Sequence, residues 1–336
     1  MNEKIINKKA VYQPCWLSYT GAMAGSLQAL GINCDIVDVG GYSGYAFLIN
    51  VSKDVTCPSG PTALGTVWKQ IHKATENLGW TLEHYTWSSH CYPEVEGKHT
   101  PHEIEVARKL FEKVKLEIKD RDMPVIVWGL VAPEYGIITG YKGESYLVST
   151  FRHLAKQPED PILFYDLHAP GGLEAFFFRE KVTRDDTLLG TGTIERAIHF
   201  AEARDPTLEN YVAGPKALDE WADVLERLPE EKQNYHGNSY VAACVCEARA
   251  ISGQFLKRLA DKYPGKDSRN LLSAAKCYKK GEELMEEFMQ IFPFKFQGQM
   301  KAKDRKKGAE LLRKIKPFEE EAINHMKKAL ETWRSQ

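Results

Sequence analysis

The sequence predicts an α+β N-terminal domain over residues 1–205 and an all-α helical-bundle domain over residues 206–336. Helical patterns dominate up to about Lys119, short strand-like runs follow up to about Leu167, and every strong pattern after about Asp205 is helical. Helices and strands are segregated in this order and do not alternate, so we expect helices packed on an antiparallel sheet rather than a doubly wound parallel sheet.

Length and composition limit the class of protein. A chain of 336 residues with 43% hydrophobic residues suffices for two domains with their own cores. A net charge of −1 argues against a chain built as a whole to bind nucleic acid or an anionic membrane. The polar, lysine-rich segment Met1–Ala10 has no apolar stretch of the length expected for a signal peptide, and no later apolar run approaches the roughly 20 residues of a membrane span. We therefore expect a cytoplasmic protein with no membrane partner.

The cysteines favour a reducing compartment and no metal or cofactor. Seven cysteines form an odd set without a C-x-x-C pair. Cys244 and Cys246 fall two apart in a predicted helix and point to different sides of it. A histidine-rich segment matches no common zinc-ligand spacing and is interpreted as loop and helix-start residues; it holds His84, His90, Cys91, His99 and His102.

The N-terminal helices have recognisable starts and stops. Small and apolar residues at helical spacing predict a helix over Ser18–Leu30 that Gly31 ends. Gly40–Gly44 predicts a tight turn followed by a strand over Tyr45–Val51. Thr100, with Pro101 after it and Glu103 three residues on, predicts a capping box at the start of a helix.

Four strand-like runs follow that helix, and the Lys142-Gly143 turn predicts a hairpin between the second and third. The runs are Pro124–Leu130, Tyr135–Tyr141, Tyr146–Phe151 and Pro161–Leu167.

The C-terminal domain is expected to be an antiparallel bundle, because four helical patterns are separated by breaks at Pro264-Gly265 and Pro293. The basic stretch Lys295–Lys316 lacks interleaved aromatic residues, so a solvated helix face is favoured over nucleic-acid binding. The predicted helices are Pro215–Leu228, Asn238–Lys262, Ser268–Ile291 and Lys307–Trp333.

Two stretches resemble a known superfamily. The first runs from Cys15-Trp-Leu-Ser18 through a helix to Gly31, and the second is Pro133-Glu134-Tyr135-Gly-Ile-Ile-Thr-Gly-Tyr141. Together they resemble papain-like cysteine peptidases, especially the bacteriocin-processing peptidases and the N-terminal domain of butirosin biosynthesis protein H. The resemblance implies a papain-like fold over roughly residues 10–170, with its nucleophile at the first stretch and its base at the second.

The chemistry implied by the resemblance needs a thiolate, an adjacent base and a group that orients the base. Cys15 is the candidate nucleophile, and Ser18 is the alternative because it lies thirteen residues before Gly31. Glu134 occupies the position of the family's histidine, and Ser149 lies near that of its Asp or Asn. His168, two residues after Asp166 and on the same strand face, is a second candidate base.

The resemblance also places a ligand cleft beside these segments. Tyr42, Ser43, Trp128 and Tyr135 lie in or next to the matched stretches and are expected to contact an apolar or acyl ligand. The leading hypothesis is a papain-like-fold protein that acts on or binds a small-molecule or carrier-bound acyl or amide ligand. The chemistry implied is acyl transfer or amide hydrolysis through a thiol nucleophile. The alternatives are a ligand-binding protein that keeps the fold with a degenerate triad, and an interaction protein that forms a homodimer through its helical domain.

Overall fold

The computed structural model describes residues 3–87 and 99–336. The chain separates into two compact units, each built from two segments. The sheet unit comprises Met1–Val39 and Leu78–Thr183, and the helical unit comprises Gly40–Asn77 and Arg184–Gln336.

This division differs from the single boundary expected at residue 205, because residues 40–77 group with the C-terminal part of the chain. Strand pairing contributes to this grouping: β2 (Asn50–Ser52) pairs antiparallel with β9 (Tyr211–Ala213). Such a pairing between distant segments cannot be read from local sequence patterns.

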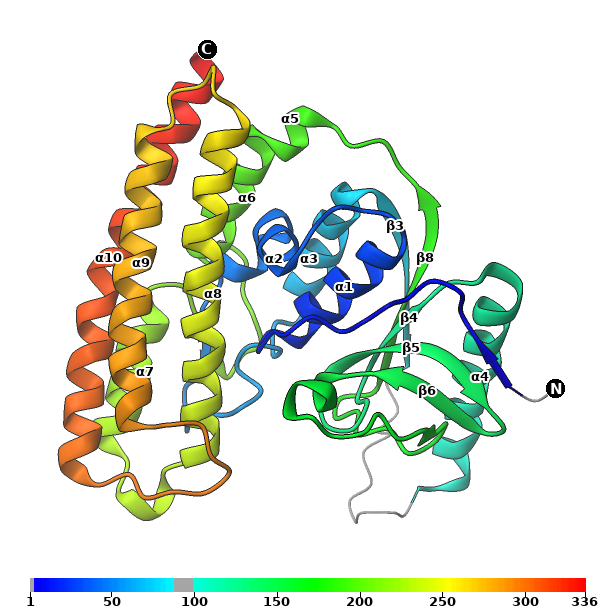
Figure 1. The fold of residues 1–336 in the computed structure, drawn as a ribbon. Helices are drawn as coiled ribbons and strands as arrows, with labels where there is room; N and C mark the ends of the chain where they lie inside the picture. Colours follow the sequence, from blue (N-terminus) through cyan, green and yellow to red (C-terminus); the bar gives the residue numbers. More distant parts are fainter. Residues whose placement is uncertain (1–2, 88–98) are drawn as a thin grey trace. The chain divides into compact units, whose positions relative to one another are not determined.

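The sheet unit is built on an antiparallel sheet, as predicted (Figure 1). In the described residues its strands follow the order β3-β8-β4-β5-β6-β7, and β1 pairs with β5. The strands are β1 (Glu3–Ile5), β3 (Trp80–Trp87), β4 (Val125–Trp128), β5 (Tyr135–Lys142), β6 (Ser145–Ser149), β7 (Ile162–Leu163) and β8 (Leu173–Lys181).

Helices cover both faces of this sheet. Successive side chains of a strand point to opposite faces. The Phe176 ring of β8 packs edge-to-face on Tyr19 of α1 (Ser18–Ala29), with centroids 5.4 Å apart. The adjacent Phe177 ring lies under the ammonium group of Lys113 from α4 (Pro101–Arg121), 4.9 Å from its centroid. The sheet therefore has an α1 face and an α4 face.

Helix α1 confirms the prediction for Ser18–Leu30, and its glycines bring the preceding chain close to it. A Cβ atom at Gly25 would lie 1.9 Å from the carbonyl oxygen of Val11, and one at Gly21 would lie 2.3 Å from that of Gln13. The segment that carries Cys15 can therefore run directly against the helix backbone only because both positions are glycine.

Helix α4 begins with the predicted capping box. Thr100 accepts a hydrogen bond from the Glu103 backbone N–H at 3.2 Å, and Glu103 Oε2 accepts from the Thr100 backbone N–H at 2.6 Å. The predicted hairpin is also confirmed, since β5 and β6 pair antiparallel with Lys142 opposite Ser145.

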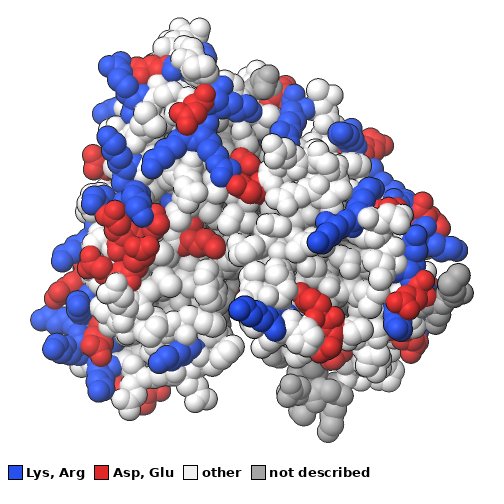
Figure 2. Space-filling view, in the orientation of Figure 1, with Lys and Arg blue, Asp and Glu red and all other residues white. Residues whose placement is uncertain are grey.

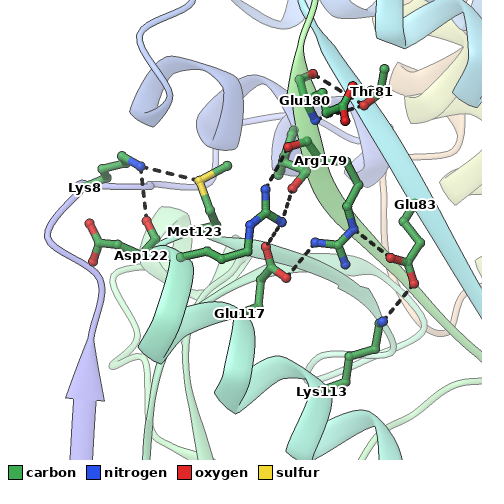
Figure 3. A network of polar contacts seen from close by, with 11 residues as sticks. Lys8, Thr81, Glu83, Lys113, Glu117, Asp122, Met123, Arg179 and Glu180 are labelled. Atoms are coloured by element: carbon green, nitrogen blue, oxygen red, sulfur yellow. Dashed lines mark hydrogen bonds and ion pairs between the residues drawn. The ribbon is translucent and has the colours of Figure 1, made fainter.

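A buried carboxylate connects α4 to the sheet (Figure 3). Glu117 is 5% exposed and accepts from Arg121 Nη1 at 2.5 Å and from Arg179 Nη1 at 2.7 Å. Arg179, on β8, also donates its Nε to Glu83 on β3 at 2.7 Å. The charge of Glu117 is therefore compensated by two guanidinium groups, which stabilises a carboxylate out of water.

The helical unit contains the predicted bundle. Its three longest helices are α8, α9 and α10. Helix α9 packs along both α8 and α10 (Figure 1). The four predicted C-terminal helices are confirmed as α7 (Lys216–Arg227), α8 (Tyr235–Lys262), α9 (Arg269–Ile291) and α10 (Ala302–Ser335). The other helices near or in this unit are α2 (Ile36–Ser43), which continues from the sheet unit, α3 (Val67–Thr75), α5 (Asp186–Leu189) and α6 (Thr191–Ala201).

The predictions of a turn at Gly40–Gly44 and of a strand that starts at Tyr45 are wrong in part. Helix α2 extends to Ser43, a 3₁₀ helix spans Tyr45–Phe47, and only Asn50–Ser52 is a strand. The glycines allow two segments to approach closely rather than form a turn, since a Cβ atom at Gly41 would lie 2.1 Å from the Phe255 ring. Gly44 alone has the left-handed conformation, with φ of 82°.

Charged side chains of both signs are interspersed on the helical unit in the view of Figure 2. Within the basic stretch, Arg313 pairs with Asp223 and Glu226 of α7, and Lys316 pairs with Asp219. Part of this stretch therefore holds two helices together. Among residues 3–87 and 99–336, no helix combines the length and apolar character needed to cross a bilayer.

Candidate functional site

The start of α1 and the start of β5 are in direct contact in the sheet unit. The Ser18 side chain is 5% exposed, and its Oγ accepts a hydrogen bond from the Tyr135 backbone N–H at 3.0 Å. The Tyr19 ring packs edge-to-face on the Tyr135 ring, with centroids 5.6 Å apart. The two segments for which the resemblance implies a nucleophile and a base therefore meet on the α1 face of the sheet.

Three strands bring a histidine, a carboxylate and a tyrosine together on this face. Tyr135 Oη of β5 donates to Glu174 Oε2 of β8, and His84 Nε2 of β3 lies 2.5 Å from Glu174 Oε1. The sheet register explains why these side chains are close. His84 lies opposite Phe176, and Glu174 precedes Phe176 by two residues, so it lies on the same face of β8. We name these three residues the His84–Glu174–Tyr135 array.

The array is partly shielded from water by aromatic rings. The His84 side chain is 27% exposed and that of Glu174 is 18% exposed. The His84 ring stacks on the Phe176 ring at 4.8 Å between centroids, and the Trp128 ring lies 4.9 Å from that of Tyr135. A carboxylate oxygen only accepts, so Nε2 of His84 is the donor in this contact. A histidine oriented by a carboxylate is the arrangement that many general bases use.

Cys15 lies three residues before α1, where the chain runs against that helix. It is 9% exposed, and its carbonyl oxygen accepts from Tyr12 Oη at 2.8 Å. A Cβ atom at Gly21 would lie 3.2 Å from Cys15 Cβ, so the cysteine packs beside the first turn of α1. The first turn of α1 holds no acidic residue, and the positive end of a helix dipole favours negative charge nearby.

Backbone hydrogen bonds join the loops that carry Glu134 and His168. The Gly129 N–H donates to the Glu134 carbonyl at 2.9 Å, and the Gly129 carbonyl accepts from the His168 N–H at 2.8 Å. Gly129 has φ of 88°, and a Cβ atom there would lie 2.7 Å from the His168 carbonyl carbon. Glycine is therefore required where these two loops meet.

The expected ligand-binding residues divide between the two units. Trp128 belongs to the sheet unit, and its indole Nε1 donates to the Pro170 carbonyl at 3.2 Å. Tyr42 and Ser43 belong to the helical unit. There Ser43 Oγ lies 3.4 Å from the Gly40 carbonyl, and the Tyr42 ring packs edge-to-face on Phe255 at 4.8 Å.

The histidine-rich segment is described only in part. His90 and Cys91 lie outside the described residues. His84 contacts Glu174 as above, the His99 ring packs on Tyr165 at 5.8 Å, and His102 is exposed in the first turn of α4.

The sequence does not single out Glu174, and the interpretation of His84 as a loop or helix-start residue is wrong, because His84 lies in strand β3. A usable signal exists, because Glu174 is the single charge in the apolar run Leu173–Phe178. A lone carboxylate beside three consecutive phenylalanines needs a buried partner. Comparison with known proteins adds no family assignment, since no family model and no curated protein matches the chain.

Proposed function

We propose that the sheet unit is a papain-like domain that acts on an acyl or amide-containing small molecule, with Cys15 as the nucleophile and His84 as the base. The observation that carries the proposal is the His84–Glu174–Tyr135 array on the same sheet face as α1. An imidazole held by a carboxylate is the usual means of activating a cysteine or serine nucleophile. The resemblance of the Cys15–Gly31 and Pro133–Tyr141 stretches to papain-like enzymes supports the same reading.

The proposed reaction proceeds through an acyl-enzyme. The Cys15 thiol gives its proton to His84 Nδ1, and the thiolate sulfur attacks the carbonyl carbon of the ligand. Backbone N–H groups at the start of α1 stabilise the oxyanion. The intermediate then collapses, and the leaving alcohol, amine or thiol takes the proton from the imidazolium. The acyl group passes from Cys15 to water or to an acceptor in the second half of the reaction.

Ser18 has a positioning role in this proposal. Its Oγ is buried and accepts from the Tyr135 backbone, so the hydroxyl joins α1 to β5. Glu174 holds the imidazole in one orientation, because one of its carboxylate oxygens contacts His84 Nε2. Tyr135 fixes Glu174 in turn by donating its hydroxyl to the other carboxylate oxygen.

The direct test is acylation of the protein by an activated ester, followed by intact-mass and peptide mass spectrometry. We expect one acyl group per chain on Cys15 and none in Cys15→Ala. Cys34→Ala is the matched control, because Cys34 is also buried in the sheet unit. We expect His84→Gln to slow acylation about 10²-fold, the usual scale for losing a general base. Glu134→Gln and His168→Gln should leave the rate within a few-fold.

Two results would overturn the proposal. If the wild type gains no acyl group while an added thiol reacts normally, the domain is a binding protein without this chemistry. If acylation depends on Glu134 or His168 and not on His84, the base is assigned incorrectly.

A further inference from the structure

The helical unit holds a cluster of metal-ligand side chains on the adjacent helices α9 and α10. Cys277 lies on α9, and Glu321 and His325 lie one turn apart on α10. One ligand atom from each residue lies within 4.8 Å of the other two. Cys277 is buried, His325 is half-buried and Glu321 is exposed, so the cluster opens to solvent on the Glu321 side.

A fourth residue fixes the histidine in the form that binds a metal. Asn270, in the first turn of α9, has its Oδ1 3.2 Å from His325 Nδ1. A carbonyl oxygen only accepts, so Nδ1 donates in this contact, which leaves Nε2 as the nitrogen that can bind a metal. Nε2 lies 3.6 Å from Glu321 Oε1. Histidines that bind metals usually donate their other N–H to such an oxygen, which sets the ring orientation.

The electron pairs of the three side chains converge on one small volume. The Cys277 thiol sulfur lies within 4.8 Å of the Glu321 carboxylate, the same carboxylate that His325 Nε2 faces. A thiol sulfur, an imidazole nitrogen and a carboxylate oxygen are all ligands that a divalent cation binds in proteins. A divalent ion that displaces the thiol proton would satisfy all three groups together.

The three ligand atoms need to move only slightly closer together to bind one metal ion. Zn–S of about 2.3 Å and Zn–N or Zn–O of about 2.0 Å place the ligand atoms of a tetrahedral ion roughly 3.3–3.6 Å from one another. The Glu321 side chain is 58% exposed and can rotate toward the other two. We propose that Cys277, Glu321 and His325 bind a zinc-like divalent cation, with a fourth position open to water. A mixed sulfur, nitrogen and oxygen set suits zinc and cobalt better than magnesium or calcium.

The test is titration of the full-length, metal-free protein with Co²⁺, read from the near-ultraviolet sulfur-to-cobalt charge-transfer band. We expect one equivalent of Co²⁺ to produce the band and Zn²⁺ to remove it by displacement. Cys277→Ser should abolish the band, and His325→Gln should weaken Co²⁺ affinity at least tenfold. Asn270→Ala should weaken affinity about tenfold but keep the band, because it orients a ligand without being one.

Cys246→Ser is the matched control, since Cys246 lies on the neighbouring helix α8 and contacts the Glu282 carbonyl instead. This variant should keep both the band and the affinity. A wild type that shows no charge-transfer band at saturating Co²⁺ would overturn the proposal. A band that survives in Cys277→Ser, with helical circular dichroism unchanged, would overturn it as well.

Discussion

Replacing Arg249 by methionine tests how the helical unit is held together. Arg249 and Glu319 form a buried ion pair, with side chains 1% and 3% exposed. The pair is bidentate, with Nε to Oε1 at 2.7 Å and Nη2 to Oε2 at 2.9 Å, and Nη1 also donates to the Ala46 carbonyl at 2.8 Å. In Arg249→Met the Glu319 carboxylate stays buried without its partner.

The structure sets the magnitude of the loss. Breaking a buried ion pair by removing one partner costs about 3–5 kcal/mol of unfolding free energy. About 2–4 °C per kcal/mol is expected for a unit of this size, which gives a fall in melting temperature of roughly 6–20 °C. Removing both charges in Arg249→Met/Glu319→Leu should recover most of this loss. The Ala46 carbonyl keeps a donor in that variant, because Ser252 Oγ lies 2.9 Å from it.

Urea unfolding followed by far-ultraviolet circular dichroism measures both variants and their coupling. A loss of less than about 1 kcal/mol of unfolding free energy in Arg249→Met would refute this prediction, since an unpaired buried carboxylate destabilises the folded state by more than that. A double variant as unstable as the single one would also refute it, because the loss would then come from packing rather than from the uncompensated charge.

Three further predictions follow from buried groups and close contacts. Glu117→Gln should destabilise the chain by about 1–3 kcal/mol in urea unfolding, because two guanidinium groups lose a charged acceptor, whereas the exposed Glu112→Gln should change stability by less than about 0.5 kcal/mol. Burial, followed by nearby carboxylates, raises the pKa of the Cys246 thiol to about 12. Alkylation of Cys246 at pH 8 should therefore be roughly 10³-fold slower than in the denatured chain, and its rate should rise about tenfold per pH unit. A pH-independent rate would contradict this prediction. Gly41→Ala should cost about 1–3 kcal/mol by overpacking, since its methyl group would overlap the Phe255 ring, and an unchanged melting temperature would contradict the close packing.

Elements with strong local signals could be predicted from the sequence. Thr100 and Glu103 form the capping box in the structure because this motif uses only residues three apart. The Lys142-Gly143 turn sets the β5–β6 hairpin for a similar local reason, with Gly143 at φ of 60°.

Strands buried on both faces were harder to recognise. Strand β8 contains the consecutive buried residues Phe176, Phe177 and Phe178. Because α1 covers one face of the sheet and α4 the other, this strand shows no alternation of apolar and polar residues. The same loss of alternation hid Glu174, whose partner His84 is 90 residues away in the sequence.

Contacts between distant segments were beyond local patterns. The proposed metal site joins Cys277 to Glu321 and His325 across two helices, so no sequence spacing resembles a zinc motif. The glycines at positions 40 and 41 permit close packing against Ile251 and Phe255. Glycines in a turn give the same sequence pattern, so the sequence alone does not separate the two roles.

Site-resolved alkylation by iodoacetamide at neutral pH is the most direct test of the proposed Cys15 nucleophile. We expect Cys15 to react faster than any other cysteine of the folded chain and faster than it does in the denatured chain. The advantage should be lost in His84→Gln and kept in Cys34→Ala. A Cys15 that reacts no faster in the folded wild type than in the denatured chain would contradict the proposed role of α1 and the His84–Glu174–Tyr135 array.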